Sequence, residues 1–220
     1  ITMIIAKLMG GLGNQMFQFA NATGLADKMG NLVKIDKSWY EGDLDVNTPR
    51  RYELDCFALD QSFVDPTRLT LVNDLSPSAK TKLYDLTKGR KKPRVLVFKE
   101  DGHGFHKEVL ELPDNSLLDG FWQTEKYFSH SRARILKDFE FINNQSKKNL
   151  EILNEIKNSN AISLHVRRGD YADDKNTNAF HGLTGLDYYK EAIKRISKQV
   201  KDPTFFVFSD DPEWCKQNLK

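Results

Sequence analysis

The first 36 residues constrain the fold most, because their pattern is that of a strand, a glycine-rich turn, a helix and a second strand. The apolar run 4–9 predicts a buried parallel strand. The apolar spacing over 15–29 predicts a helix that stops at Gly30, and residues 32–36 predict the next strand. Parallel strands joined through a helix form a βαβ unit, so we expect an α/β protein with a parallel sheet.

The rest of the chain repeats this alternation and divides at the polar stretch 143–148. We therefore predict two domains, 3–144 and 145–220. The second shows two clear strands where a nucleotide-binding half has about three, so we expect it to be incomplete in this chain. The further elements that we predict are strands at 94–98, 117–121, 161–166 and 205–208, and helices at 124–139 with Thr124 as N-cap, at 149–158, at 187–200 and from Pro212.

Composition excludes several classes of protein. Lys and Arg number 33 against 31 Asp and Glu, a net charge of +2 that argues against a dedicated nucleic-acid binder. An apolar run long enough to predict a transmembrane segment is absent from the sequence. The pattern of an export signal is absent too, so we expect a cytoplasmic location. Cys56 and Cys215 predict free thiols, with one bridge as the alternative.

The turn between the first strand and helix is the first candidate binding site. Glycines such as Gly11 and Gly13 let a ligand approach the backbone, and the helix N-terminus offers N–H groups to an anion or a sugar. Asn14 and Gln15 add amide groups. Gln15 occupies the third glycine position of the dinucleotide fingerprint, so that motif is absent. A tight turn that packs the helix on the strand is an equally good interpretation.

A second candidate site follows the strand at 161–166. His165 and Arg167 share one face of that strand, and the adjacent guanidinium groups of Arg167 and Arg168 suit a pyrophosphate. Asp170 can hold an arginine in place. A salt-bridged strand end is the alternative, which we favour less.

Two further strand ends carry polar or aromatic residues. Ser209 and Asp210 could accept hydrogen bonds from a nucleoside, whereas Asp211 fits better as the cap of the helix that begins at Pro212. Trp122 and Gln123 could hold a sugar, although a core position is the favoured interpretation for an aromatic strand end. We expect no metal site, because the histidines lack the spacing of a ligand set.

Four motifs in this order resemble the α-1,2-fucosyltransferases of glycosyltransferase family 11. They are Gly-Gly-Leu-Gly-Asn-Gln-Met-Phe-Gln at 10–18, Asp-Gly-Phe-Trp-Gln-Thr-Glu-Lys-Tyr-Phe at 119–128, His-Val-Arg-Arg-Gly-Asp-Tyr at 165–171 and Phe-Ser-Asp-Asp-Pro-Glu-Trp at 208–214. The resemblance implies a GT-B-like fold of two Rossmann-like domains, with the acceptor side in 3–144 and the donor-binding side in 145–220. It also implies an inverting transfer of L-fucose from GDP-fucose to the 2-hydroxyl of a terminal galactose in a glycan, with no metal or other cofactor.

The resemblance also implies roles for residues. Arg167 would bind the donor pyrophosphate and stabilise the leaving group, with His165, Arg168 and Asp170 in support. It also implies that Asn14 faces the donor sugar and that Ser209 and Asp210 lie toward the nucleoside. From the residues themselves, we add Gly11, Gly13 and Gln15 to the predicted donor-binding set, and we predict Trp122 and Gln123 as acceptor-binding residues. Asp173 and Asp174 are candidates for the general base, although a solvated loop is the favoured interpretation there.

Three interpretations of the function remain open. The first is the fucosyltransferase, the second is a non-catalytic or truncated relative that binds nucleotide-sugar or glycan, and the third is a transferase for another nucleotide-sugar. The basic run 88–94 is best interpreted as a solvated loop, with peripheral contact to an anionic membrane as the alternative.

Overall fold

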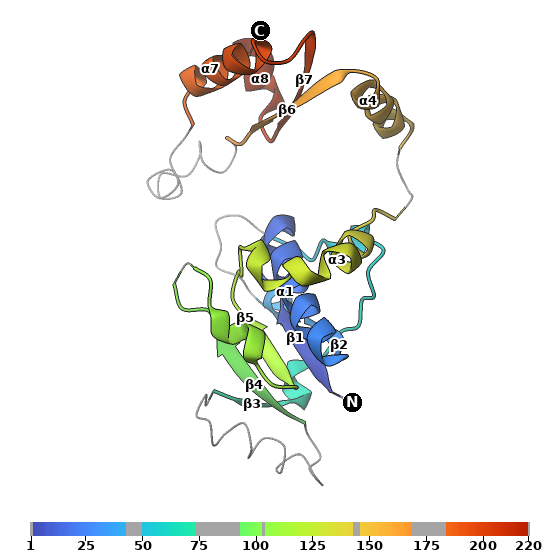
Figure 1. The fold of residues 1–220 in the computed structure, drawn as a ribbon, viewed down its shortest axis with the longest axis vertical. Helices are drawn as coiled ribbons and strands as arrows, with labels where there is room; N and C mark the ends of the chain where they lie inside the picture. The colour runs from blue at the N-terminus through green and yellow to red at the C-terminus, as the bar shows by residue number, and fades with distance from the viewer. Residues whose placement is uncertain are drawn as a thin grey trace. The chain divides into compact units, whose positions relative to one another are not determined.

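The computed structural model describes residues 2–42, 50–73, 93–102, 104–142, 146–168 and 184–219. The chain forms two compact units, Ile1–Ile142 and Asn143–Lys220, and each is described by itself (Figure 1). Both cysteines are free thiols, as predicted.

Unit 1 is built on a five-stranded sheet of the order β2-β1-β5-β4-β3, in which every strand pairing is parallel. This confirms the predicted parallel α/β architecture. The strands are β1 (Met3–Lys7), β2 (Leu32–Asp36), β3 (Thr70–Val72), β4 (Arg94–Lys99) and β5 (Ser116–Asp119), and the α-helices are α1 (Leu12–Met29) and α3 (Arg132–Asp138). Short 3₁₀ turns lie at Ser38–Glu41, Leu54–Cys56, Pro66–Arg68, Lys107–Glu111, Glu125–Tyr127 and Ser129–Ser131.

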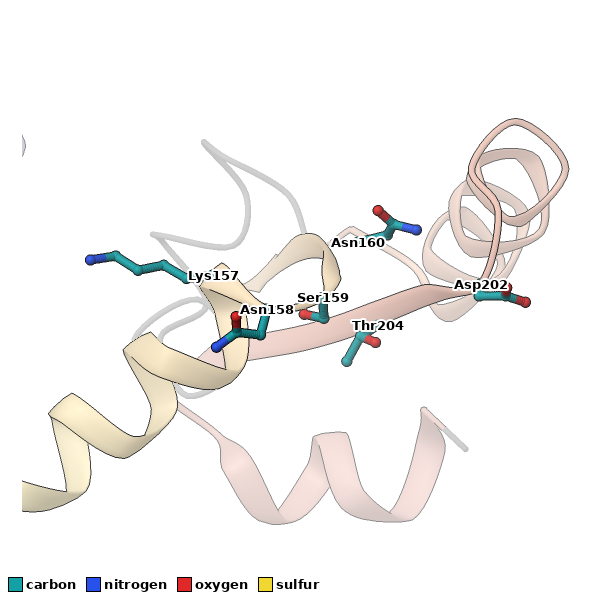
Figure 2. A pocket seen from close by; sticks show the side chains of 6 residues that line it. All are labelled: Lys157, Asn158, Ser159, Asn160, Asp202 and Thr204. Atoms are coloured by element: carbon teal, nitrogen blue, oxygen red, sulfur yellow. The ribbon is translucent and has the colours of Figure 1, made fainter.

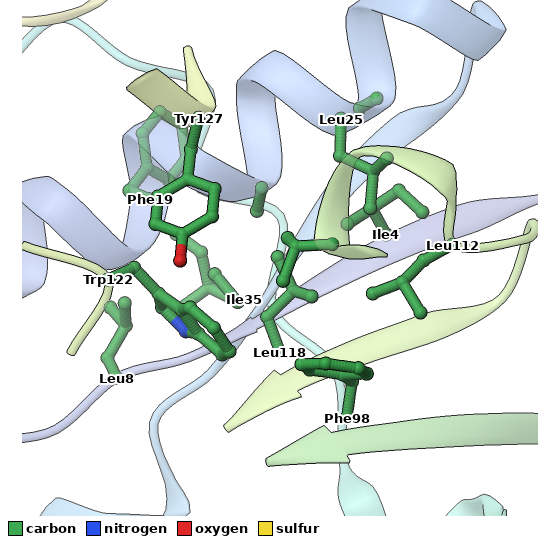
Figure 3. Packing of buried hydrophobic residues seen from close by; sticks show 14 of the residues in the cluster. Ile4, Leu8, Phe19, Leu25, Ile35, Phe98, Leu112, Leu118, Trp122 and Tyr127 are labelled. Atoms are coloured by element: carbon green, nitrogen blue, oxygen red, sulfur yellow. The ribbon is translucent and has the colours of Figure 1, made fainter. Parts of the chain in front are cut away.

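The sheet of unit 1 is buried on both faces, which explains the continuous apolar run of β1. Ile4 joins a core cluster with Phe19 and Leu25 of α1 (Figure 3). Ile5 joins a smaller cluster on the opposite face. Side chains alternate along a strand, so a strand between two apolar layers has no polar face. Gly30 ends α1 in the left-handed conformation, with φ 65°, and donates its N–H to the Ala26 and Asp27 carbonyls, as the predicted stop requires.

The helix predicted at 124–139 is wrong in its first half. Two 3₁₀ turns take its place, and α3 begins only at Arg132. Phe128, with φ −137° and ψ 12°, is outside the helical region. The tertiary contacts decide this, because the Tyr127 hydroxyl accepts from His106 N and donates to Gly104 O. Thr124 does cap the first turn, accepting from Lys126 N at 3.5 Å.

Unit 2 contains a parallel two-stranded sheet with helices. Its elements are α4 (Lys147–Lys157), β6 (Asn160–Val166), α7 (Leu186–Ser197), β7 (Pro203–Ser209) and α8 (Pro212–Asn218), close to the predicted ranges. A small core of Val166, Tyr189 and Cys215 joins β6, α7 and α8. Asp211 caps α8 by accepting from Trp214 N at 3.1 Å, and Pro212 is its first residue, so the predicted cap is confirmed.

Candidate functional site

The glycine turn of unit 1 is shaped by backbone conformation. Gly10 has φ +76°, and a Cβ there would lie 2.6 Å from Asn14 Nδ2, so this position needs glycine. Gly11 is the N-cap of α1 and has no side chain to accept from the first N–H groups of the helix. The Tyr40 hydroxyl donates to Gly10 O at 3.0 Å, and burial raises the pKa of this phenol well above its usual value, so it remains a donor. The turn is thus fixed by protein contacts.

Gln15 is a scaffold residue in this structure, which leaves its side chain no accessible atom for the predicted contact with the donor. Its side chain is fully buried, with Nε2 donating to Gly10 O at 3.1 Å and to Arg51 O at 2.9 Å. Its Oε1 accepts from Glu53 N at 2.9 Å. Both amide hydrogens are therefore used inside the protein, and Gln15 ties the segment 51–53 to the glycine turn.

Two predicted residues from distant motifs meet beside the turn. Gln123 Nε2 donates to Asn14 Oδ1 at 2.7 Å, across a sequence separation of 109 residues. Asn14 is half-buried, whereas Gln123 and Gly13 are exposed. The structure therefore brings the amides assigned to the donor side and to the acceptor side into one place, and it leaves them accessible to a ligand.

Trp122 is a core residue in this structure, and its side chain is not accessible for the predicted contact with an acceptor. Its side chain is 0% exposed, and its ring centroid lies 5.7 Å from that of Tyr127 and 6.0 Å from that of Phe98 (Figure 3). The favoured alternative, a core aromatic, is confirmed. Trp122 has φ 55°, a conformation that costs a non-glycine residue about 1–3 kcal/mol. This left-handed backbone buries the indole while its neighbours Phe121 and Gln123 stay exposed.

Glu100, which the sequence analysis missed, holds that strained segment. Its carboxylate accepts from Phe121 N at 2.6 Å and from Trp122 N at 3.2 Å. Gly120 allows this approach, since a Cβ there would lie 2.4 Å from Glu100 Cβ. A lone glutamate after a strand gives no motif, so only the fold could have identified it.

Arg167 and Arg168 follow β6 in unit 2, and residues 209–211 lie at the end of β7; these two short segments together are named the arginine turn. The register of the parallel pair places Val166 beside Ser209, so the segments after both strands begin side by side. Arg168 N donates to Asp210 Oδ1 at 2.8 Å, which joins the two segments. Ligands of open α/β sheets bind at this carboxyl edge. The structure thus brings together the predicted residues of two separate motifs.

The side chain of Arg168 is engaged within unit 2. Its guanidinium carbon lies 4.1 Å from the centroid of the Trp214 ring, and its Nε lies 3.8 Å from Asp211 Oδ2. Ser209 Oγ accepts from Asp211 N at 2.9 Å, which orders the same turn. The arginine turn is therefore held together by Arg168, Ser209 and Asp210 through contacts within unit 2.

Of the other residues predicted for this site, the structure describes two and leaves three outside the described ranges. His165 is exposed, and Arg167 is half-buried. Asp170, Asp173 and Asp174 lie outside the described residues, as do residues 88–92 of the basic run.

A hollow lies at the opposite edge of the unit 2 sheet. It has a volume of about 450 Å³, and Figure 2 shows its lining of Lys157, Asn158, Ser159, Asn160, Asp202 and Thr204. Asn160 and Thr204 stand at the amino ends of β6 and β7. Because ligands of such sheets bind at the carboxyl edge, this hollow is not the candidate site.

Comparison with known proteins identifies the family. A sequence profile described as "Glycosyl transferase family 11" matches residues 101–220, which include three of the four motifs. The "Alpha-1,2-colitosyltransferase" of Escherichia coli is 30% identical over 219 residues, covering 99% of this chain and 72% of that protein. The chain belongs to glycosyltransferase family 11.

Other relatives of this family 11 chain are more distant. The mouse "Galactoside alpha-(1,2)-fucosyltransferase 1" is 26% identical, covering 96% of this chain and 49% of that protein. A crystal structure of the fucosyltransferase NodZ from Bradyrhizobium is 17% identical, with a TM-score of 0.47 over 98% of this chain and 74% of that chain. A TM-score at this level does not establish a shared fold, so the GT-B arrangement of the two units stays a prediction.

Two features are absent from the part of the chain that the structure describes. Within that part, no helix is both long enough and apolar enough to cross a bilayer. The same part holds no group of three or more His, Cys, Asp or Glu side chains that could bind a metal ion, and independence of a metal stays a prediction for this family 11 chain.

Proposed function

We propose an inverting α-1,2-fucosyltransferase activity for this chain, which moves L-fucose from GDP-fucose to the 2-hydroxyl of a terminal galactose. The support is its membership of family 11, together with two relatives named for α-1,2 transfer. The observation that carries the proposal is the arginine turn, in which Asp210 and Trp214 fix the backbone and side chain of Arg168 next to Arg167. A fixed turn of this kind can present a guanidinium to a pyrophosphate.

The proposed mechanism assigns unit 2 to the donor and unit 1 to the acceptor. The galactose 2-hydroxyl attacks the anomeric carbon of fucose from the face opposite GDP, while the bond from that carbon to the β-phosphate oxygen breaks. The hydroxyl proton leaves to a general base, and Arg167 stabilises the negative charge that develops on GDP. Asp170 would orient the arginines, and His165 would line the same edge.

Unit 1 contributes its accessible groups in this proposal. The backbone of Gly11 and Gly13 and the amide of Asn14 face the donor sugar, and Gln123 faces the acceptor. The hydrogen bond between Asn14 and Gln123 holds the two amides against each other within unit 1.

The first experiment measures GDP binding by calorimetry and GDP-fucose turnover with lactose as acceptor. Arg167→Ala removes charged hydrogen bonds to phosphate, each worth about 1.5–3 kcal/mol, so we expect at least about a tenfold loss of GDP affinity and no turnover. The matched control is Arg195→Ala, in the last turn of α7, which should change neither. Full GDP binding and turnover by Arg167→Ala would refute the assignment. GDP binding without turnover by the unaltered chain would favour a non-catalytic relative.

A second candidate donor is GDP-colitose, because the relative at 30% identity is named a colitosyltransferase. Colitose is fucose without its 3-hydroxyl. A site that hydrogen-bonds this hydroxyl rejects the deoxy sugar strongly, whereas a site that does not discriminates weakly. Turnover of both donors in parallel decides between them, and preference for GDP-colitose would replace fucose in the proposal.

A further inference from the structure

A cavity of about 350 Å³ in unit 1 has an exposed aromatic wall. Phe105 and Phe121 both line it, with 39% and 40% of their surface exposed. Their neighbours in sequence and space, Trp122 and Tyr127, are fully buried in the core. Exposed rings that share one hollow offer an apolar face to a ligand.

The remaining wall of the cavity is polar and carries both signs of charge. Glu100, Gln123 and Lys126 line it. The Lys126 ammonium lies 5.6 Å from the centroid of the Phe105 ring. Glu100 Oε2 accepts from both Phe121 N and Trp122 N, whereas Oε1 accepts from Trp122 N alone and retains capacity for a further hydrogen bond. The cavity therefore offers an acceptor, an amide and a cationic donor around two rings.

This combination fits a neutral sugar better than an anion or an apolar ligand. A carboxylate would repel phosphate, and an apolar ligand would leave the charged groups without partners. A pyranose has hydroxyls that donate and accept, together with faces made of C–H groups that stack on aromatic rings. In galactose the axial 4-hydroxyl leaves one face with contiguous C–H groups, which glucose lacks.

The cavity is also held in shape before a ligand arrives. Glu100 binds the backbone of Phe121 and Trp122, and the buried indole anchors the segment with φ 55°. Gln123 is joined to Asn14 of the glycine turn at 2.7 Å. A cavity that is already formed avoids the entropic cost of ordering its walls on binding.

We propose that this cavity is the subsite for the terminal galactose of the acceptor. Phe121 stacks on the C–H face of the sugar, Glu100 accepts from a hydroxyl, and Lys126 donates to one. The identity of the sugar as the acceptor rests on the proposed function, whereas binding of a galactoside to the cavity is tested on its own.

The test is saturation-transfer NMR on the 220-residue chain with methyl β-D-galactopyranoside, and with methyl β-D-glucopyranoside as the epimer control. We expect galactoside binding that is at least about fivefold tighter than glucoside binding and that weakens about tenfold or more in Phe121→Ala. Phe141→Ala is the matched control, because Phe141 is 61% exposed in unit 1 and does not line the cavity. It should bind the galactoside as the unaltered chain does.

Three results would overturn the inference: no galactoside binding by the unaltered chain, equal binding by Phe121→Ala, or loss of the galactoside signal when GDP is added. The last would place the sugar in the nucleotide site. Phe105→Ala serves as the second variant if Phe121→Ala fails to fold, as judged by its thermal melting. GDP affinity is measured in parallel, so failure of the proposed function (no GDP binding or turnover) is distinguishable from failure of the cavity to bind galactoside.

Discussion

Replacing Gln15 tests whether the glycine turn uses this residue as scaffold or as ligand contact. Gln15→Ala removes hydrogen bonds to Gly10 O, Arg51 O and Glu53 N. Each such bond contributes about 0.5–1.5 kcal/mol. The Gly10 carbonyl keeps its bond from Tyr40, so the full loss falls on two partners.

The expected cost of Gln15→Ala follows from these bonds. The lost hydrogen bonds and the small cavity together lower the free energy of unfolding by about 2–4 kcal/mol. The higher helix propensity of alanine returns a few tenths of a kcal/mol at most. Urea denaturation followed by tryptophan fluorescence measures the change, because Trp122 lies in the core of the same unit.

The neighbouring residue provides the matched control. Asn14→Ala loses one bond at the surface, to Gln123, and should cost about 1 kcal/mol or less while it abolishes donor turnover. Gln15→Ala should show the opposite pattern. Its free energy of unfolding should fall, whereas at low temperature the molecules that remain folded should keep part of their donor turnover. If Gln15→Ala unfolds within about 0.5 kcal/mol of the unaltered chain and yet loses donor binding, the scaffold argument is wrong.

Three further predictions concern packing, the arginine turn and alkaline stability. Gly24→Ala places a methyl 2.8 Å from Tyr127 O. The overpacking cost of about 1–3 kcal/mol exceeds the gain in helix propensity of about 1 kcal/mol, so the urea midpoint of unfolding should fall. A rise in the midpoint would contradict this. Arg168→Lys keeps the positive charge but loses the planar stack on Trp214, so the free energy of unfolding of unit 2 should drop by about 1 kcal/mol. The loss of GDP affinity should be smaller than in Arg167→Ala. An unchanged melting temperature would contradict a contribution of the stack to stability. Burial, with a smaller effect from Asp55, raises the pKa of Tyr52 to about 12. The Tyr52 phenol therefore ionises at a lower pH in the unfolded chain than in the folded one, so the free energy of unfolding should decline as the pH rises from about 10 to 12. The decline measured by urea midpoints should be shallower in Tyr52→Phe, and identical slopes would rule out this contribution.

The sequence alone predicted the elements whose pattern is local. The apolar run of β1, the left-handed stop at Gly30 and the cap of α8 by Asp211 are each determined within a few residues, and all three appear in the structure. The order of four motifs also identified the family, because a spacing of this kind is specific even where each motif by itself is not.

Only the tertiary structure decided what the side chains of those motifs do. Gln15 and Asn14 are adjacent amides in one motif, yet the helix turns one into the core and leaves the other accessible. Trp122 and Phe121 divide in the same way, because a backbone with φ 55° buries one ring and exposes the other. Glu100 gains its role from a strand that neighbours β5 only in the folded sheet. Burial and hydrogen bonding depend on contacts between residues far apart in the sequence, and no local pattern contains that information.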